Sequence, residues 1–161
     1  MLNSLLKKLP LQTVYAHCDI PCGIYDPYPM QLAAHTVIRM NMLADELRKA
    51  EDIDEFEKEH KLARLTKVKE EHAEILKHEV SVLYGDYFKA EHLEKYEGLS
   101  ELIFQTLKLA SACKQELNLE KAKELLSNTQ KIAVIFYESK GLEIQRIPSA
   151  YPTAGDIVTH K

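Results

Sequence analysis

Apolar residues recur at steps of three and four along most of this 161-residue chain, which is the spacing of helices with one buried face. The pattern predicts four long helices, over about residues 27–48, 53–83, 100–117 and 118–140, with a short helical turn over 91–97. No alternation typical of strands competes with it. Four amphipathic helices with short connections favour an antiparallel four-helix bundle, so the predicted fold class is all-α.

Residues typical of helix ends mark the boundaries. Asp26 followed by Pro27 is typical of an N-cap and a first helical position. The pair at 85–86, Gly-Asp, is expected to end the second helix, Asn118 to cap the fourth, and Gly141 to end it. The second helix is expected to bury one seam of residues: Leu62, Leu65, Val68, His72, Ile75 and Val82.

Both ends of the chain depart from this helical pattern. Residues 1–16 are rich in leucine and end in Val-Tyr-Ala, which resembles a cleavage site, so we expect a leader or pro-segment. Two lysines and Pro10 interrupt the apolar core that a secretory signal needs. The expected location is therefore cytoplasmic, with export through the leader as the alternative. Residues 142–161 are expected to form an irregular tail, after a body spanning 17–141.

Composition narrows the possible partners. The net charge is −4 with no long basic run, which argues against nucleic acid as the main partner. No apolar run approaches the roughly 20 residues that span a bilayer, so no membrane association is expected. Three cysteines do not make a disulfide framework, and Cys113 is expected to be a buried structural thiol.

The candidate chemistry lies in His17-Cys18-Asp19-Ile20-Pro21-Cys22. Thiolates and imidazole suit soft or borderline metals, but a closed zinc site needs four ligands and no second pair exists. On spacing alone, a reactive dithiol or a disulfide loop is the favoured interpretation. Cleavage after Ala16 would change this, because His17 would gain a free α-amine. That amine, the Cys18 amide and the two sulfurs would form a square-planar site suited to nickel.

The stretch from His17 to Pro27, HCDIPCGIYDP, resembles the nickel hook of nickel superoxide dismutases. A second stretch, His78 to Lys89, is similar to that family's segment at the end of its second long helix. The resemblance, from about His17 to Lys140, implies a precursor cut after Ala16 by a processing protease. It also implies a four-helix bundle with an N-terminal metal-binding hook, a homohexamer and one nickel ion per subunit. The implied activity converts superoxide to O₂ and hydrogen peroxide by nickel(II)/nickel(III) cycling.

The resemblance also assigns roles to single residues. His17, Cys18 and Cys22 would bind nickel, with the His17 imidazole as an axial ligand of the oxidised state. Asp19 and Tyr25 would line the pocket beside the metal, where Tyr25 would order superoxide or water. Two further residues match the pocket's surroundings, Tyr87 and, more weakly, Lys89.

The chain departs from the family at two positions. In the family's better-known members, a glutamate on the first helix and an arginine on the second orient the axial imidazole. Ala33 and His72 stand at the corresponding places here. His72 is therefore a candidate replacement for the arginine, although a lone histidine on an apolar face is more often a core residue.

The sequence thus predicts an enzyme, a nickel superoxide dismutase. Two alternatives stay open: a nickel-binding bundle that uses the same hook without turnover, and a thiol-bearing helical bundle that binds a partner.

Overall fold

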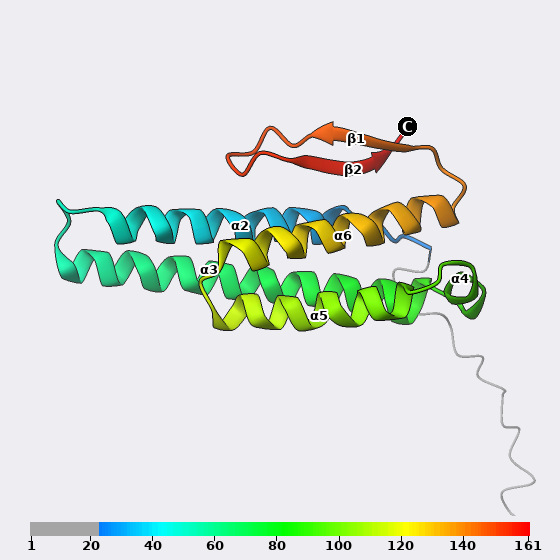
Figure 1. The fold of residues 1–161 in the computed structure, drawn as a ribbon, viewed down its shortest axis with the longest axis horizontal. Coiled ribbons are helices and arrows are strands. Elements are labelled where there is room, and N and C mark those ends of the chain that lie inside the picture. The colour runs from blue at the N-terminus through cyan, green and yellow to red at the C-terminus, as the bar shows by residue number, and fades with distance from the viewer. Residues whose placement is uncertain (1–22) are drawn as a thin grey trace, which may run out of the picture.

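The computed structural model describes residues 23–161, and four long helices dominate it (Figure 1). They are α2 (Tyr28–Lys49), α3 (Glu55–Val82), α5 (Leu99–Gln115) and α6 (Leu119–Ser139), with the short α4 (Ala90–Lys95) between α3 and α5. Helix α2 packs against α3 and α6, and α5 packs against α3 and α6. The prediction of a mostly helical chain with four long helices and one short one is confirmed.

The buried faces of three helices agree with the predicted periodicity. On α5 and α6, apolar residues at steps of three and four include the buried Leu99, Ile103, Leu125 and Phe136. On α2, residues at the same spacing are buried from Met30 to Ala44. In these helices the apolar positions fall on one face, so the 3.6-residue period alone identifies the core side.

The predicted seam of α3 is wrong by one residue. Leu62 and Ile75 are exposed, whereas Lys69, Ala73, Leu76, Val80 and Leu83 are buried. Apolar residues occur on both sides of α3, and the true seam includes a lysine, so the pattern of apolar positions favoured the neighbouring stripe. The Lys69 ammonium lies at the end of α5 and donates to the Glu116 carbonyl at 2.6 Å and the Lys114 carbonyl at 3.2 Å.

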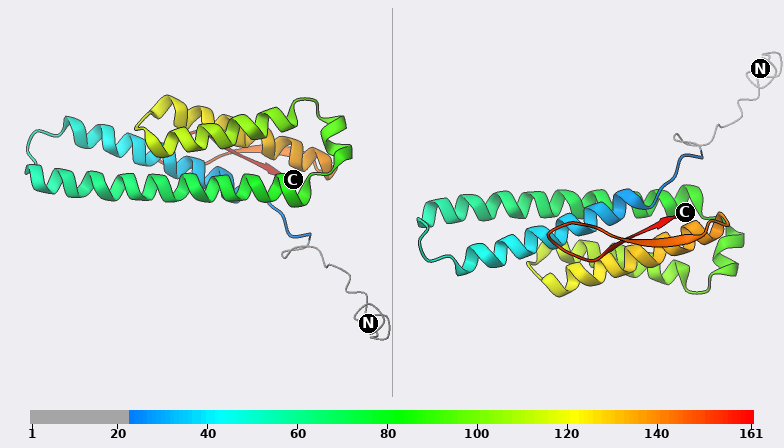
Figure 2. Two further views of the ribbon diagram at one scale, coloured as in Figure 1. Left: turned by 90° about the horizontal axis from the view of Figure 1, so that it is seen from below. Right: turned by 90° about the horizontal axis from the view of Figure 1, so that it is seen from above.

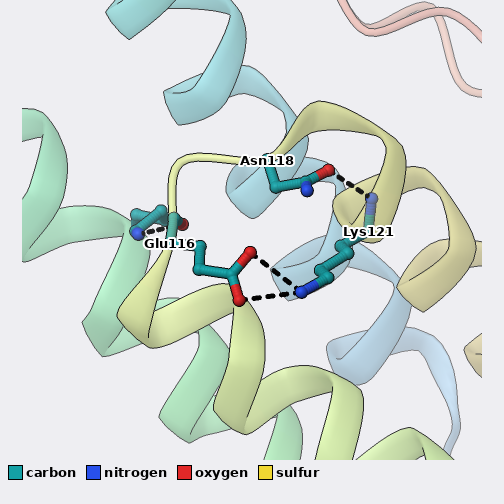
Figure 3. A network of polar contacts seen from close by, with 4 residues as sticks. Glu116, Asn118 and Lys121 are labelled. Atoms are coloured by element: carbon teal, nitrogen blue, oxygen red, sulfur yellow. Dashed lines mark hydrogen bonds and ion pairs between the residues drawn. The ribbon is translucent and has the colours of Figure 1, made fainter.

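The helix ends combine expected and unexpected features. Helix α2 begins at Tyr28, one residue later than predicted, and the Asp26 carboxylate accepts the Tyr28 N–H at 2.7 Å. Asn118 caps α6 as predicted, accepting the Lys121 N–H at 3.1 Å, while the Glu116 carboxylate pairs with the Lys121 ammonium (Figure 3).

The Gly-Asp pair at 85–86 does not end the second helix. It lies inside a π-helical turn, η1 (Leu83–Tyr87), closed by a 2.8 Å bond from the Phe88 N–H to the Leu83 carbonyl.

The expectation of an irregular tail is also wrong, and with it the strict all-α class. Strands β1 (Ile144–Pro148) and β2 (Asp156–His160) form an antiparallel hairpin, with Ile144 opposite His160 and Pro148 opposite Asp156. The hairpin lies across α2 and α6 (Figures 1 and 2). Two residues of β2, Ile157 and Val158, are buried against these helices. The strands are short and a proline ends β1, so packing on the helices decides their structure more than propensity does.

A further negative finding concerns membranes. No helix within residues 23–161 combines the length and the apolar character required to cross a bilayer.

Candidate metal centre

The proposed nickel ligands His17, Cys18 and Cys22, together with Asp19, lie outside the described residues, so their roles stay predictions. The described chain begins at Gly23 and enters α2 five residues later. The structure therefore describes the base from which the predicted hook departs.

A cavity of about 320 Å³ lies at this base. One side comes from the segment leading into α2, with Ile24, Tyr25, Asp26 and Pro29. The other side comes from the end of α3 and the start of η1, with His78, Glu79, Val82 and Leu83. The described end of the first stretch that carries the family resemblance is thus adjacent in space to the second, although fifty residues separate the two stretches. Tyr25 lines this cavity, and its predicted place beside the metal stays a prediction.

Tyr25 and Tyr87 pack together. Their ring centroids are 5.7 Å apart at a tilt of 57°, a geometry favourable for aromatic pairs. Tyr87 reaches this place because η1 widens the last turn of α3. Tyr87 also packs on Phe136 of α6, with ring centroids 4.5 Å apart.

The Tyr87 hydroxyl is directed toward α6. It lies 2.6 Å from the Ser139 Oγ, which itself donates to the Phe136 carbonyl at 2.7 Å. Because the serine has one proton and uses it on that carbonyl, the Tyr87 hydroxyl is the donor to Ser139. The Tyr87 proton is therefore used in the hydrogen bond to Ser139 of α6. Tyr87 supports the Tyr25 ring by packing.

Lys89 takes a structural position at the start of α4. Lys89 is exposed, and its backbone N–H donates to the His92 Nδ1 at 3.0 Å. The His92 ring then stacks on Tyr87, with centroids 5.6 Å apart and planes within 8°. The positive charge near the rings of Tyr87 and Phe136 comes from Lys140, whose ammonium lies 4.5 Å from the Phe136 ring centroid.

His72 and Ala33 do not reach the described cavity. The His72 Nδ1–H donates to the Val68 carbonyl at 2.9 Å, within its own helix, and Ala33 is buried at 2% exposure. Neither residue lines the cavity at the hook base. A role for His72 toward the axial imidazole stays a prediction.

Within residues 23–161, no three His, Cys, Asp or Glu side chains are grouped closely enough to hold a metal ion. Cys113 is buried as predicted, and burial raises the pKa of its thiol to about 11, which keeps it protonated near neutral pH. The donor set that suits nickel therefore remains the one predicted for the hook.

Comparison with known proteins places the chain in a family. The model of the family described as "Nickel-containing superoxide dismutase" matches residues 12–140. The chain belongs to this family. A "Superoxide dismutase [Ni]" of Streptomyces coelicolor is 40% identical over 131 residues, which cover 81% of this chain and 93% of the relative. The corresponding protein of Streptomyces seoulensis is 34% identical over 131 residues, with the same coverage.

Solved structures of nickel superoxide dismutases show the same fold. A native structure aligns with a TM-score of 0.65 and 38% identity, covering 77% of this chain and 99% of that chain. A structure with nickel ligation corresponding to the oxidised state aligns with a TM-score of 0.66 and 34% identity, covering 78% of this chain and 99% of that chain.

Sequence reasoning missed several residues around the cavity. Glu79 is a charged residue between Ile75 and Val82 of the predicted seam, which is a signal, but no sequence pattern indicates that it lines a cavity with His78. Ser139 and His92 contact Tyr87 from two other elements, and their separation in sequence hides this relation.

Proposed function

We propose that this member of the nickel-containing superoxide dismutase family dismutates superoxide with nickel held by His17, Cys18 and Cys22. The observation that carries the proposal is the family match over residues 12–140, which includes the whole hook. The cavity at the hook base, with Tyr25 at its edge, supports it.

The donor set fits the metal. The two thiolates, the His17 α-amine and the Cys18 amide would provide two sulfur and two nitrogen ligands, a set suited to nickel in tetragonal geometry. When bound, nickel supplies one-electron chemistry by alternating between its divalent and trivalent states. The amine exists only after cleavage, so removal of residues 1–16 by a processing protease belongs to the proposal.

The chain's own residues would then admit and order a small anion. Tyr25, held by the Tyr87 ring, would position superoxide or a water by hydrogen bonding, and Asp19 would line the same pocket. Two superoxide anions and two protons become one O₂ and one hydrogen peroxide, so protons must reach the pocket. A pocket water ordered by Tyr25 is the proposed proton source.

The scaffold and the assembly are part of the same proposal. The long helices would act as an antiparallel four-helix bundle carrying the hook, in a cytoplasmic homohexamer with one nickel per subunit. Light scattering on the protein beginning at His17 would measure the assembly. A mass of six subunits would support it, and a monomer would contradict it.

The decisive experiment compares two forms of the protein, one beginning at His17 and one at Ala16. Both are loaded with nickel, and superoxide decay is measured directly. We expect fast decay only with the His17 form, because only this form has the free amine in the ligand position. Inactivity of both forms despite bound nickel would instead favour a nickel-binding bundle without turnover.

A further inference from the structure

The C-terminal hairpin lies outside the part of the chain that matches the family. The match ends at residue 140, whereas the hairpin spans 144–160. It packs on α6 and on α2, the helix that follows the hook (Figure 2). Its hydrogen bonds with α2 are made by Tyr28, Gln31 and His35.

The main contact is a pair of hydrogen bonds between Gln31 and the backbone of Val158. The Gln31 Nε2 donates to the Val158 carbonyl at 2.9 Å, and the Val158 N–H donates to the Gln31 Oε1 at 2.8 Å. Both residues are fully buried. The amide therefore replaces a strand partner along the edge of β2, where unpaired backbone groups would otherwise be buried without a bond. These two bonds fix the rotation of α2 about its axis and its axial position relative to the hairpin.

Two contacts flank Gln31 on the same face of α2. The Tyr28 and Tyr151 hydroxyls lie 3.0 Å apart. The buried His35 lies 2.7 Å from the Thr153 hydroxyl through its Nδ1 and 3.4 Å from the Asp156 carbonyl through its Nε2. Residues three and four apart share one face of a helix, so the hairpin holds α2 along a continuous stripe.

A third link runs from the hairpin to the hook base through α6. The His160 ring packs on Tyr137, with centroids 5.1 Å apart. The Tyr137 hydroxyl donates to the Asp26 Oδ1 at 3.4 Å, the same oxygen that accepts the Tyr28 N–H. Asp26 is four residues beyond the proposed ligand Cys22. Because Asp26 is so close to Cys22 in the chain, a displacement of its carboxylate would also displace the hook.

We propose that the C-terminal hairpin positions the nickel hook, with Gln31 and Tyr137 as positioning residues that hold the start of α2. The inference rests on the proposed function, since it concerns the metal that the hook holds. Within residues 23–161, the hairpin packs on α2 and α6. Through these contacts it would fix the direction in which the chain leaves α2 toward the proposed ligands. Partners that orient ligands from outside the coordination sphere influence metal affinity in this way.

The test uses the nickel-loaded protein beginning at His17 and measures nickel release to an excess of chelator. Gln31→Met removes both bonds to Val158 with little change in volume. Its matched control is Asn41→Leu, also at a buried amide on α2, whose bond goes to the Val37 carbonyl of the same helix. Ten residues separate the two positions, or about 15 Å along the helix. We expect Gln31→Met to release nickel about tenfold faster, with a shifted visible absorption of the nickel centre, and Asn41→Leu to do neither.

Tyr137→Phe is the second variant, because it removes only the hydroxyl that reaches Asp26. We expect a severalfold faster release and the same direction of spectral shift. Release rates and spectra unchanged in both Gln31→Met and Tyr137→Phe would overturn the positioning role while leaving the proposed function intact. If the unsubstituted protein binds no nickel, the proposed function and this inference both fail.

Discussion

At the scale of single residues, several side chains at the hook base are occupied by contacts within the protein. The Tyr87 proton is donated to Ser139, and the Asp26 carboxylate serves the Tyr28 N–H and the Tyr137 hydroxyl. Tyr25 lies at the cavity, supported by the Tyr87 ring. The residues that support the site and the residue that faces the cavity are therefore distinct.

This distinction can be tested with Tyr87→Phe. The substitution removes one hydrogen bond and keeps the ring packing, so we expect a loss of about 1 kcal/mol in the free energy of unfolding. The nickel-dependent rate of superoxide decay should stay within about twofold, since the hydroxyl proton is not directed at the cavity. Urea unfolding and direct superoxide decay measure the two quantities.

The control is Tyr84→Phe, which removes an exposed tyrosine hydroxyl that bonds Ser100 at 3.3 Å. It should change neither quantity measurably. A large loss of activity in Tyr87→Phe with nickel still bound would show that its hydroxyl acts on the substrate.

At the scale of elements, polar side chains buried between helices fix how the helices meet. Lys69 of α3 satisfies the carbonyls of Lys114 and Glu116 where α5 ends. Asn118, in the connection that follows, caps α6 (Figure 3). Positive charge at a helix C-terminus is favourable because the last carbonyls have no partner within the helix. Burial lowers the Lys69 pKa, which shows that the position carries a desolvation cost.

We expect Lys69→Ala to lower the free energy of unfolding by about 2–4 kcal/mol, because it leaves a cavity and two unpaired carbonyls. Lys69→Met keeps most of the volume and should cost less, about 1–2 kcal/mol. Lys67→Ala is the control: its side chain is 76% exposed, so its loss should cost no more than about 0.5 kcal/mol. Urea unfolding of the three variants measures the differences, and equal stability of Lys69→Ala and Lys67→Ala would contradict the prediction.

At the scale of the whole molecule, the hairpin joins the last residues of the chain to α2 and α6 and thereby to the region beside the hook. His35 lies in this junction. Its Nε2–H donates to the Asp156 carbonyl, so the neutral ring accepts from the Thr153 hydroxyl through Nδ1. Burial lowers the His35 pKa, which means that the folded protein favours the neutral ring.

The pH dependence of stability follows from that direction. Because the folded pKa lies below the unfolded value of about 6.5, the unfolded chain binds a proton first as the pH falls. The contribution of His35 is therefore complete above about pH 6.5 and is lost as the pH falls toward the folded pKa. Unfolding free energies measured between pH 7.5 and pH 5 in steps of about half a unit should show this decline.

His35→Gln should reduce that decline, since an amide does not titrate in this range. Stability that stays constant between pH 7.5 and 5, or a decline that His35→Gln leaves unchanged, would contradict the role assigned to His35.

Local sequence patterns are enough to predict the helices, most of their ends, the buried faces of α2, α5 and α6, and the hook motif. These features depend on neighbours within a few residues: the helical period, the Asp26 carboxylate that accepts the Tyr28 N–H, the cap at Asn118, and the short ligand spacing of the hook. Long-range packing determines which face of α3 is buried, how η1 places Tyr87 against Tyr25, and that the tail is a hairpin bound to α2 through Gln31. Each of these depends on contacts between residues far apart in the chain, such as Lys69 with the end of α5 or Gln31 with Val158. Their free energy comes from burial and hydrogen bonds that exist only after the helices have packed, so no local pattern indicates them.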